Sequence, residues 1–430
     1  MKKKVLIVAY AFPPMAFIGS QRPHGLAKYL NQFGWEPIIL TIKSPGAAAE
    51  DFKVIGTDYT DRLALMKKTL RLDTGKGIHQ QLGITITRNF NYPTWKSKTI
   101  KFLKELAVFP DEEIGWYRHA VKAAFELLDK EEIHAVISTS FPVTSHLIAR
   151  RIKQKYGVPW VADLRDLWTQ NHYYGKFKVI SFFERRLELK TLSQADVLVT
   201  ISNPLAETLK SLHLDKDIRC ITNGYDPEDF DKKTANLTEK FTITYTGRLY
   251  NGKRDPSVLL KAIAGLIKEN RIRKDLIEIR FFGGHEDWLI NDIKEHGLQD
   301  IVKINGFVSR EEAIEKQKES QLLLLLLWDD KEEKGVYTGK LFEYLGAKRP
   351  IVAIGGANSI VRDLLENTNA GHFAENQEQS EAVIMHYYYE FIKQGAVEYR
   401  ANEKISEYAY NEIAEKYSRL LNEVASFPTV

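Results

Sequence analysis

The chain has almost no cysteine: among its 430 residues, Cys220 is the only one. An intrachain disulfide and a cysteine-rich metal site are therefore excluded, and a reducing compartment is the natural expectation. The 11 histidines show no metal-ligand spacing, and neither a GxSxG nor a P-loop motif occurs. The sequence thus indicates no bound metal and no protein nucleophile of these types.

Long apolar runs and a strong charge of one sign are also lacking. Apolar runs such as Leu322–Trp328 are far too short to span a bilayer. Val5–Ala11 follows three lysines, as in a signal peptide, but Pro13 and Pro14 come next without a small-residue cleavage pattern, so we interpret the run as a buried strand. Lys and Arg number 61 against 57 Asp and Glu, which favours no nucleic-acid partner. We expect a cytoplasmic protein.

What the sequence does contain is an alternation of strand and helix signals. Short apolar runs bounded by turn formers are typical of parallel strands covered on both faces. In the first half, the predicted strands are Val5–Tyr10, Glu36–Thr41, Ala135–Thr139, Trp160–Asp163 and Val197–Ile201. Amphipathic stretches lie between several of them, which predicts a doubly wound α/β domain.

The same pattern restarts after the turn-rich segment Ile221–Asp229. The second set of predicted strands is Phe241–Thr246, Ile277–Phe282, Ile301–Ile304, Leu322–Leu327 and Ile351–Ile354, with helices from Asp255, from Glu286 and at Lys340–Ala347. The chain is therefore predicted to form two Rossmann-like domains, residues 1–225 and 226–404, followed by a last helix within 405–430. Residues 45–110 show weak periodicity and are predicted to hold an insertion.

Ligands of open α/β sheets bind beyond the carboxyl ends of the strands, so residues there are candidates. Arg248 and Lys253 lie on one loop after a strand, and two cations so placed suit a diphosphate; the alternative is a pair of solvated loop charges. Gly19, in the first strand–helix loop, would let backbone amides approach an anion, or would serve a generic turn. The same two interpretations apply to Gly283 and Gly284 after another strand.

A further loop, Tyr337-Thr338-Gly339, leads into a helix that carries Glu343 among apolar residues. A carboxylate in such surroundings needs a partner, because burying it alone is costly. Ribose hydroxyls would be a suitable partner, and the alternative is an outward-facing position on the polar stripe of the helix.

Charges also follow a strand of the first domain. Asp163, Arg165 and Asp166 would either face the active-site crevice or form an Asp–Arg ion pair that holds the loop. Asp329–Asp330 follow a strand too, but a charged run comes after them, so we interpret them as solvated rather than metal-binding.

Taken together, these residues resemble family 4 of the glycosyltransferases, retaining enzymes of the GT-B fold in which two Rossmann-like domains face a central cleft. The resemblance extends over nearly the whole chain. It is carried by the loop glycine Gly19, the NGYDPEDF linker from Asn223, the Gly-Arg-Leu-x-x-x-Lys pattern from Gly247, the turn at Phe282–Gly284, the helix Gly339–Pro350, and a final helix at Tyr410–Leu421 that looks like the one crossing back to the N-terminal domain.

The resemblance implies a role for each site residue. Arg248 and Lys253 would neutralise the leaving diphosphate of a donor such as a UDP- or GDP-sugar, without metal or cofactor. Glu343 would hold the ribose, and the backbone of Tyr337–Gly339 would contact phosphate and sugar. The segment Asp163–Asp166 takes the place of a histidine that many relatives carry near the acceptor.

The implied activity is retaining transfer of a sugar to an acceptor bound by the N-terminal domain. The acceptor would be a glycan or lipid-linked precursor in bacterial surface-glycan assembly. Relatives often carry a second Glu where this chain has Gly335. Two alternatives stay open: a sugar-nucleotide 2-epimerase, which shares the architecture, and a GT-B chain that only binds a partner or nucleotide.

Two basic amphipathic segments of the first domain bear on location. In Trp95–Phe109, apolar residues share one side of the predicted helix and three lysines gather toward another. The lysines are Lys98, Lys101 and Lys104, and the apolar residues are Ile100, Leu103, Leu106 and Ala107. Tyr173–Lys190 likewise mixes cations with phenylalanines. Such helices either lie on an anionic membrane surface, here the inner face of the plasma membrane, or pack on the domain core.

Overall fold

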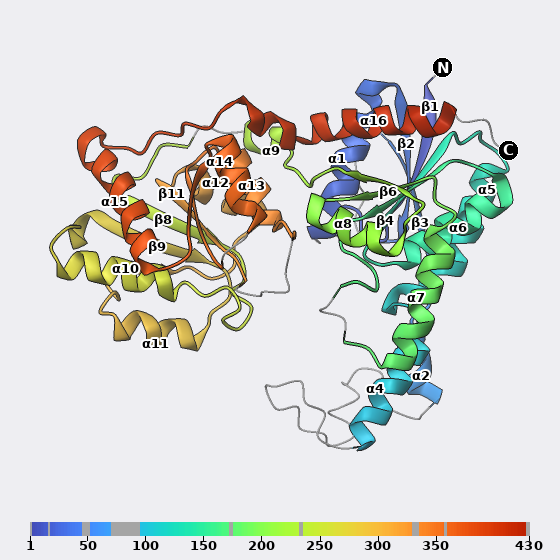
Figure 1. Ribbon diagram of the computed structural model, residues 1–430, viewed down its shortest axis with the longest axis horizontal. Coiled ribbons are helices and arrows are strands. Elements are labelled where there is room, and N and C mark those ends of the chain that lie inside the picture. Colours follow the sequence, from blue (N-terminus) through green and yellow to red (C-terminus); the bar gives the residue numbers. More distant parts are fainter. Residues whose placement is uncertain are drawn as a thin grey trace. The chain divides into compact units, whose positions relative to one another are not determined.

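The computed structural model describes residues 2–15, 18–44, 52–69, 95–171, 175–231, 235–328, 335–356 and 359–426. The chain divides into two compact units (Figure 1): unit 1 is Met1–Ile221 with Ala414–Val430, and unit 2 is Thr222–Ile413. Among the described helices, none combines the length and the apolar character that crossing a bilayer requires.

Unit 1 is built on a seven-stranded parallel sheet with the order β3-β2-β1-β4-β5-β6-β7. Its strands are β1 (Lys3–Val8), β2 (Trp35–Ile42), β3 (Lys53–Thr57), β4 (Ala135–Ser140), β5 (Trp160–Leu164), β6 (Val197–Thr200) and β7 (Asp217–Cys220). The central strands β4 and β5 are buried along their whole length, as expected for a sheet covered on both faces. The edge strands β3 and β7 are short and partly exposed.

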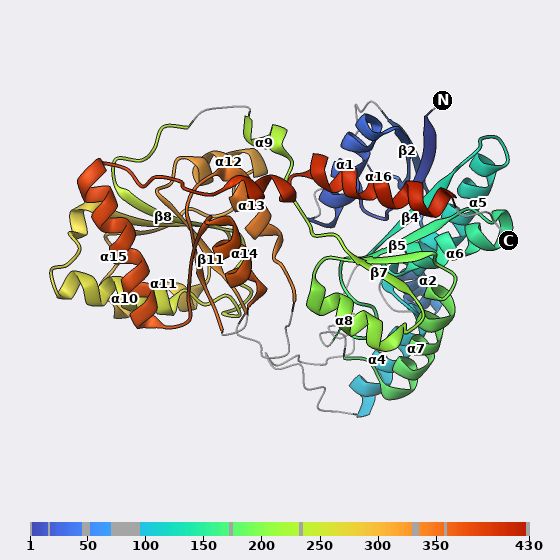
Figure 2. The same cartoon turned by 45° about the horizontal axis from the view of Figure 1, so that its top comes forward.

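The helices of unit 1 lie on or near this sheet, except that α4 lies away from it, beside α7, as Figures 1 and 2 show. They are α1 (Gln21–Leu30), α2 (Arg62–Thr69), α4 (Trp95–Ala107), α5 (Tyr117–Leu128), α6 (Thr144–Tyr156), α7 (Lys178–Leu192), α8 (Asn203–Leu212) and α16 (Tyr410–Ser426), with 3-10 turns at Ile18–Ser20, Asn31–Phe33 and Glu112–Trp116. The final helix α16 lies on unit 1: the Ser418 hydroxyl donates to the Phe33 carbonyl at 3.1 Å, and the Lys3 ammonium donates to Asn422 at 3.2 Å.

Unit 2 is built on a six-stranded parallel sheet with the order β10-β9-β8-β11-β12-β13. Its strands are β8 (Phe241–Thr246), β9 (Ile277–Phe282), β10 (Val302–Ile304), β11 (Leu322–Leu326), β12 (Ile351–Ile354) and β13 (Gly371–Ala374). Its helices are α9 (Pro227–Asp231), α10 (Ser257–Lys268), α11 (Asp287–Glu295), α12 (Arg310–Lys318), α13 (Gly339–Ala347), α14 (Ile360–Thr368) and α15 (Gln377–Gln394), with 3-10 turns at Lys274–Leu276 and Glu403–Tyr408.

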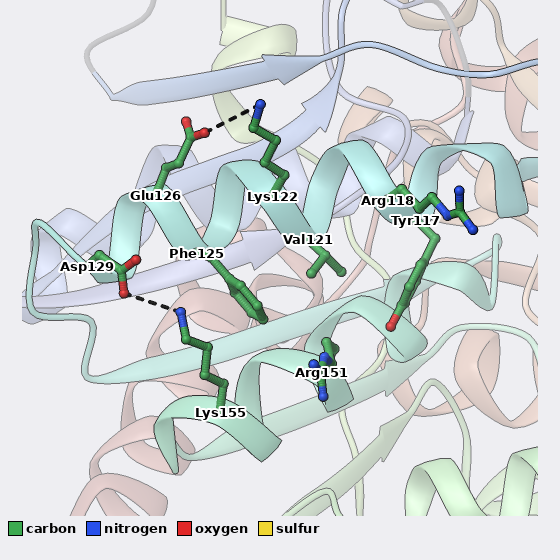
Figure 3. Close-up of a pocket in the computed structure, with 9 residues that line it drawn as sticks. All are labelled: Tyr117, Arg118, Val121, Lys122, Phe125, Glu126, Asp129, Arg151 and Lys155. Atoms are coloured by element: carbon green, nitrogen blue, oxygen red, sulfur yellow. Dashed lines mark hydrogen bonds and ion pairs between the residues drawn. The ribbon is translucent and has the colours of Figure 1, made fainter.

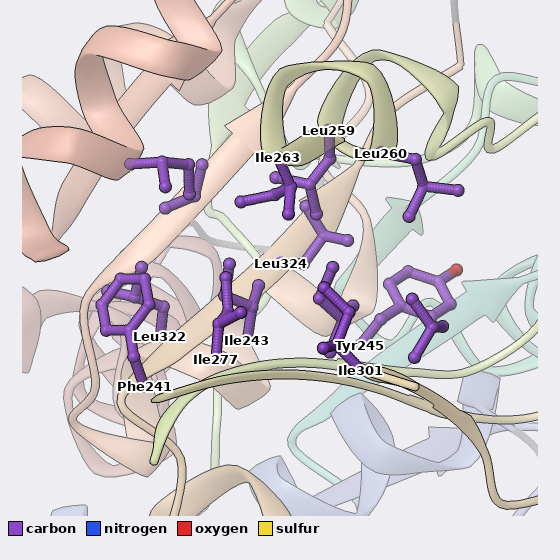
Figure 4. Close-up of a cluster of buried hydrophobic side chains, with 14 of the residues drawn as sticks. Phe241, Ile243, Tyr245, Leu259, Leu260, Ile263, Ile277, Ile301, Leu322 and Leu324 are labelled. Atoms are coloured by element: carbon purple, nitrogen blue, oxygen red, sulfur yellow. The ribbon is translucent and has the colours of Figure 1, made fainter. Parts of the chain in front are cut away.

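Apolar side chains of the strands and helices form the cores. In unit 2, Ile243 and Leu324 point from the sheet toward Leu259 and Ile263 of α10, and all four are fully buried (Figure 4). A second cluster on the other face of this sheet packs Leu323 and its neighbours against α13 and α14. Both faces are thus covered, which explains why β11 is an unbroken run of leucines.

The predicted fold class is confirmed: the chain is α/β, with two parallel, helix-covered sheets. The run interpreted as a first buried strand is β1, and the predicted strands of both halves are all present. Their limits differ by a few residues; β1, for example, ends at Val8 rather than at Tyr10. The predicted insertion in residues 45–110 contains strand β3 and helices α2 and α4 among its described residues.

Candidate functional site

Two glycine turns meet at the carboxyl edge of the unit 2 sheet. The Gly247 amide, after β8, donates to the Phe282 carbonyl at 2.6 Å, and the Gly283 amide, after β9, donates to the Gly306 carbonyl at 2.8 Å. A Cβ atom on Gly283 would lie 2.0 Å from the Gly247 carbonyl oxygen, so that position accepts only glycine. Gly284 is half-buried beside the Phe307 ring. The backbone therefore carries no side chains at this point of the edge, where ligands of such sheets bind.

The two cations predicted on the loop after β8, Arg248 and Lys253, each lie near an aromatic ring. The Arg248 guanidinium lies 5.6 Å from the ring centroid of Phe307, and the Lys253 ammonium lies 4.4 Å from that of Trp328. Both cations are exposed. Phe307 follows β10 and Trp328 follows β11, so three strand ends contribute to this group. Arg248 forms no ion pair with any residue that the structure describes, which leaves its charge available to a ligand.

The N-terminus of α13 brings a third cation to the same place. The half-buried Lys340 ammonium lies 5.5 Å from the ring centroid of Tyr245, and a Cβ atom on Gly247 would meet it at 2.0 Å. Burial lowers the pKa of Lys340 to about 8; the nearby Arg254 acts in the same direction, and Glu343 opposes them. The hydroxyl of Thr338, the residue before the helix, is buried without a hydrogen-bond partner in the described part of the chain.

Arg254 is the fourth cation of this edge. Its guanidinium lies 4.9 Å from the Tyr250 ring, and its buried Nε has no hydrogen-bond partner among the described residues. Sequence reasoning missed both Arg254 and Lys340. Both could have been found in the sequence, because Arg254 directly follows the candidate site residue Lys253 and Lys340 directly follows the candidate Gly339.

Glu343 lies in the second turn of α13, half-buried. The Gln317 amide donates to its Oε1 at 3.2 Å and to the Thr246 hydroxyl at 2.9 Å. The Thr246 amide in turn donates to the Tyr344 hydroxyl at 3.0 Å. Glu343 is thereby held at the end of β8 and does not face solvent on an outer stripe. Tyr337 is half-buried against Phe342, with ring centroids 5.6 Å apart.

In unit 1, Asp163 occupies a buried charge network. Both Asp163 oxygens accept from the Arg22 guanidinium at 3.0 Å, and the Thr139 hydroxyl donates to one of them at 2.9 Å. Arg22 also donates to the Tyr417 hydroxyl of α16 and to the Ile221 carbonyl, each at 2.9 Å. Although burial opposes ionisation, the Arg22 charge holds the pKa of Asp163 below its usual range. This geometry supports the ion-pair interpretation, with Arg22 as the partner.

Arg165 has a different set of partners. It donates to the Ser140 carbonyl at 2.8 Å and to the Gly19 carbonyl at 2.6 Å, so it joins the end of β4 to the loop after β1. Gly19 is buried at this junction. Asp166 is exposed on the same loop and is the member of the trio that solvent reaches most easily.

A carboxylate that sequence reasoning missed lies near the same edge of unit 1. Burial, and after it the charge of the neighbouring Asp111, raise the pKa of Glu113 to about 7. Burial raises the pKa of the Tyr10 phenol, which follows β1, and the nearby Glu113 carboxylate acts in the same direction. Asp111 accepts from the backbone amide and hydroxyl of Thr144, at 2.8 and 2.6 Å. No sequence motif contains Glu113, because its neighbours come from three separate segments.

Away from the sheet edges, a hollow of about 460 Å³ lies between α5 and α6 (Figure 3). Its charges are largely paired: the Lys155 ammonium lies 3.5 Å from Asp129, and Lys122 lies 3.9 Å from Glu126. In the described ranges, no three His, Cys, Asp or Glu side chains are placed to hold a metal ion. Asp329–Asp330 lie outside the described residues.

The sequence also matches two protein-family models, one in each half of the chain. Residues 85–229 match the description Glycosyltransferase Family 4, and residues 240–385 match Glycosyl transferases group 1, together about two thirds of the chain. The chain therefore belongs to the glycosyltransferases of the GT-B fold, with a family 4 N-terminal domain. The comparison with curated proteins gives no match.

Solved structures show the same fold at low sequence identity. A glycosyltransferase from Rickettsia africae is 15% identical, with a TM-score of 0.58 over 99% of each chain. The Anabaena protein HepE, in complex with UDP and glucose, is 14% identical with a TM-score of 0.58, over 98% of this chain and 100% of its own. Sucrose-phosphate synthase from Thermosynechococcus elongatus is 12% identical with a TM-score of 0.56, over 99% of this chain and 96% of its own.

Proposed function

We propose that unit 2 binds a nucleoside-diphosphate sugar and that the chain transfers its sugar, with retention of anomeric configuration and without a divalent metal, to an acceptor bound by unit 1. The observation that carries this proposal is the group of cations at the carboxyl edge of the unit 2 sheet. Arg248, Lys253 and Arg254 come from one loop, beside the bare backbone of Gly247 and Gly283. A diphosphate is the ligand whose charge and size match such a group.

The chemistry follows from these charges. When the bond between the anomeric carbon and the diphosphate oxygen breaks, negative charge grows on the leaving diphosphate. Arg248 and Lys253 are placed to stabilise it, in the way that fixed donors stabilise a developing anion. The acceptor hydroxyl then attacks the same face of the sugar and gives up its proton to the departing phosphate oxygen. No protein nucleophile takes part, and the configuration is retained.

Glu343 fixes the other end of the donor. Its carboxylate lies at the end of β8, with Gln317 as its hydrogen-bond donor. A carboxylate that accepts from the two ribose hydroxyls would orient the nucleoside so that the diphosphate reaches the cations. Because the HepE structure contains UDP and glucose, UDP-glucose is the first donor to test.

The test is a panel of nucleotide sugars, assayed for donor hydrolysis and for transfer, with wild type and the variants Arg248→Ala and Lys253→Ala. The expected result is turnover of one donor, reduced roughly a hundredfold in each variant, which corresponds to ~3 kcal/mol of transition-state stabilisation. Release of a 2-epimer would favour the epimerase. Tight donor binding without turnover would favour a non-catalytic binding protein, and unchanged turnover in both variants at saturating donor would contradict the assignment.

Exposed apolar side chains on α4 and α7 favour an acceptor at a membrane surface. Leu106 of α4 is 58% exposed, and Phe182 and Phe183 of α7 are 52% and 56% exposed. The two helices belong together, since the Phe102 ring lies 5.5 Å from that of Phe177, just before α7 (Figures 1 and 2). We define the apolar face of unit 1 as the exposed side chains of Leu103, Leu106, Val179, Phe182 and Phe183.

The cations around this face come mainly from α7. Lys101 donates to the Gly175 carbonyl at 2.8 Å and Lys104 pairs with Glu112 at 2.7 Å, so both support the local fold. Arg185 and Lys190 are exposed and form no ion pair with the described residues. Near an anionic surface each such cation contributes ~1 kcal/mol. The acceptor would accordingly be lipid-linked, as in bacterial surface-glycan assembly.

Sedimentation with vesicles of graded anionic content tests this location. Binding should rise with anionic lipid, fall with salt, and weaken in Phe182→Ser/Phe183→Ser and in Arg185→Glu/Lys190→Glu. Leu214→Ser is the matched control, because Leu214 is 70% exposed elsewhere on unit 1. A protein that stays in the supernatant at low salt with highly anionic vesicles would have a soluble acceptor.

A further inference from the structure

Lys340 is a largely enclosed cation with no ion-pair partner among the described residues. Its ammonium is enclosed by the Tyr245 ring and the Gly247 backbone, and no residue of the described chain forms an ion pair or hydrogen bond with it. Three ionisable groups face it: Arg254 from the loop after β8, Glu343 from its own helix, and the Tyr245 phenol from β8. Arg254 repels the ammonium, and Glu343 is already engaged by Gln317.

The surroundings of Lys340 offer an anion several further partners. The first-turn amides of α13 have no carbonyl partner within the helix, and the helix dipole makes this end positive. The Thr338 hydroxyl, directly before these amides, is buried with no hydrogen-bond partner in the described chain. Lys340 thus lies between a helix N-terminus that favours anions and the glycine turn after β8. Such a helix N-terminus binds a phosphate readily.

We propose that the Lys340 ammonium is a direct ligand of the donor's diphosphate, together with Arg248 and Lys253. This proposal rests on the nucleotide-sugar site proposed above. The three cations would then clamp the two phosphates between the loop after β8 and the N-terminus of α13. Gly247 would be glycine because the lysine side chain fills the volume that any Cβ atom there would need.

A structural role and a ligand role for Lys340 predict opposite effects on the empty protein. A lysine kept for packing would stabilise the fold, whereas a buried cation without a partner destabilises it until its anion arrives. The lowered pKa of about 8 agrees with the second case, because the protein disfavours the charged form. Binding of a diphosphate should restore the charge and draw a proton from solution.

Calorimetry of Lys340→Met tests the proposal. UDP, GDP and ADP are titrated into wild type, and the tightest binder is carried forward together with its nucleoside. Lys340→Met should weaken the nucleoside diphosphate roughly tenfold to a hundredfold, the usual effect of a charge-assisted hydrogen bond, and leave the nucleoside unchanged. Lys261→Met is the control, because Lys261 is exposed on α10 of the same unit. The empty variant should melt no lower than wild type.

Proton uptake provides a second measurement, made on wild type and on Lys340→Met. At pH 8.5 in buffers of different ionisation enthalpy, binding should take up about 0.8 proton per site, as a group of pKa about 8 becomes fully charged. Lys340→Met should take up none. Binding to wild type without proton uptake, or equal affinity of wild type and Lys340→Met, would overturn the role of Lys340 alone. Failure of all three nucleoside diphosphates to bind wild type would overturn the proposed donor site and this proposal together.

Discussion

Replacing Asp163 with Asn should destabilise unit 1 rather than remove a catalytic group. The side chains of Asp163 and Arg22 are 0% and 2% exposed, and two hydrogen bonds of 3.0 Å join them. Asn keeps the shape of Asp but leaves the guanidinium charge without its counter-charge. Removing one partner of a buried ion pair typically costs about 3–5 kcal/mol.

That magnitude is large for a single unit. Domains are stable by only about 5–15 kcal/mol, and for a unit of this size each kcal/mol lowers the melting temperature by roughly 2–4 °C. We therefore expect the transition of unit 1 to fall by about 10 °C, measured by calorimetry and by urea unfolding. Because the lowered pKa of Asp163 makes its contribution present above the unfolded value of 3.8, the gap between wild type and variant should be full at pH 7 and shrink below about pH 4.

Two further variants make the comparison decisive. Asp166→Asn changes another carboxylate of the same loop, and because burial raises the pKa of Asp166, this variant should not lower the transition. Arg22→Met with Asp163→Leu replaces the whole pair by apolar side chains and should recover much of the lost stability. If Asp163→Asn melts with wild type but loses turnover at an unchanged donor affinity, Asp163 acts on the acceptor and the structural role is refuted.

Three other predictions concern Glu343, Glu113 and the need for a metal ion. Glu343→Gln should weaken binding of the nucleoside diphosphate roughly tenfold, because an amide accepts ribose hydroxyl protons less well than a carboxylate; an unchanged dissociation constant in calorimetry would remove Glu343 from the site. Glu113→Gln should gain stability relative to wild type as the pH rises from 5 to 8 in urea unfolding. The reason is that the folded pKa of about 7 lies above the ordinary 4.5, so wild type loses stability across that window; a difference independent of pH would contradict it. Transferase activity should survive EDTA. Activity that is lost in EDTA and restored by Mg²⁺ or Mn²⁺ would show that the Arg and Lys side chains do not stabilise the leaving diphosphate without a metal ion.

Most of the fold could be predicted from the sequence because central parallel strands carry a strong signal. Strands such as β11, buried on both faces, must be apolar throughout, and the runs stand out. The edge strands β3, β7 and β13 were not foreseen. Segments such as Asp217–Cys220 are partly exposed and mix polar with apolar residues, so no buried run marks them. Sheet order depends on tertiary contacts and has no local signature.

Site residues that lie close together in the sequence could be predicted, whereas those brought together from distant segments by the fold could not. Arg248 and Lys253 share one loop, so their spacing was visible in the sequence. The partners of Asp163 were not, because Arg22 is 141 positions away along the chain and reaches it only through the fold. Lys340 was visible as a residue, but its burial without an anionic partner appears only when α13 is placed against Gly247.

The cations of unit 2 link the stability of the empty protein to its function. Arg254 repels the Lys340 ammonium, and a protein selected for stability alone would separate or pair such charges. A bound diphosphate replaces this repulsion with attraction to both, so the donor should stabilise unit 2 beyond its contacts with the nucleoside. By mass action, a ligand at a hundred times its dissociation constant adds about 2.7 kcal/mol to stability. The arrangement therefore favours a unit 2 that is completed by its donor, with the diphosphate as the missing counter-charge.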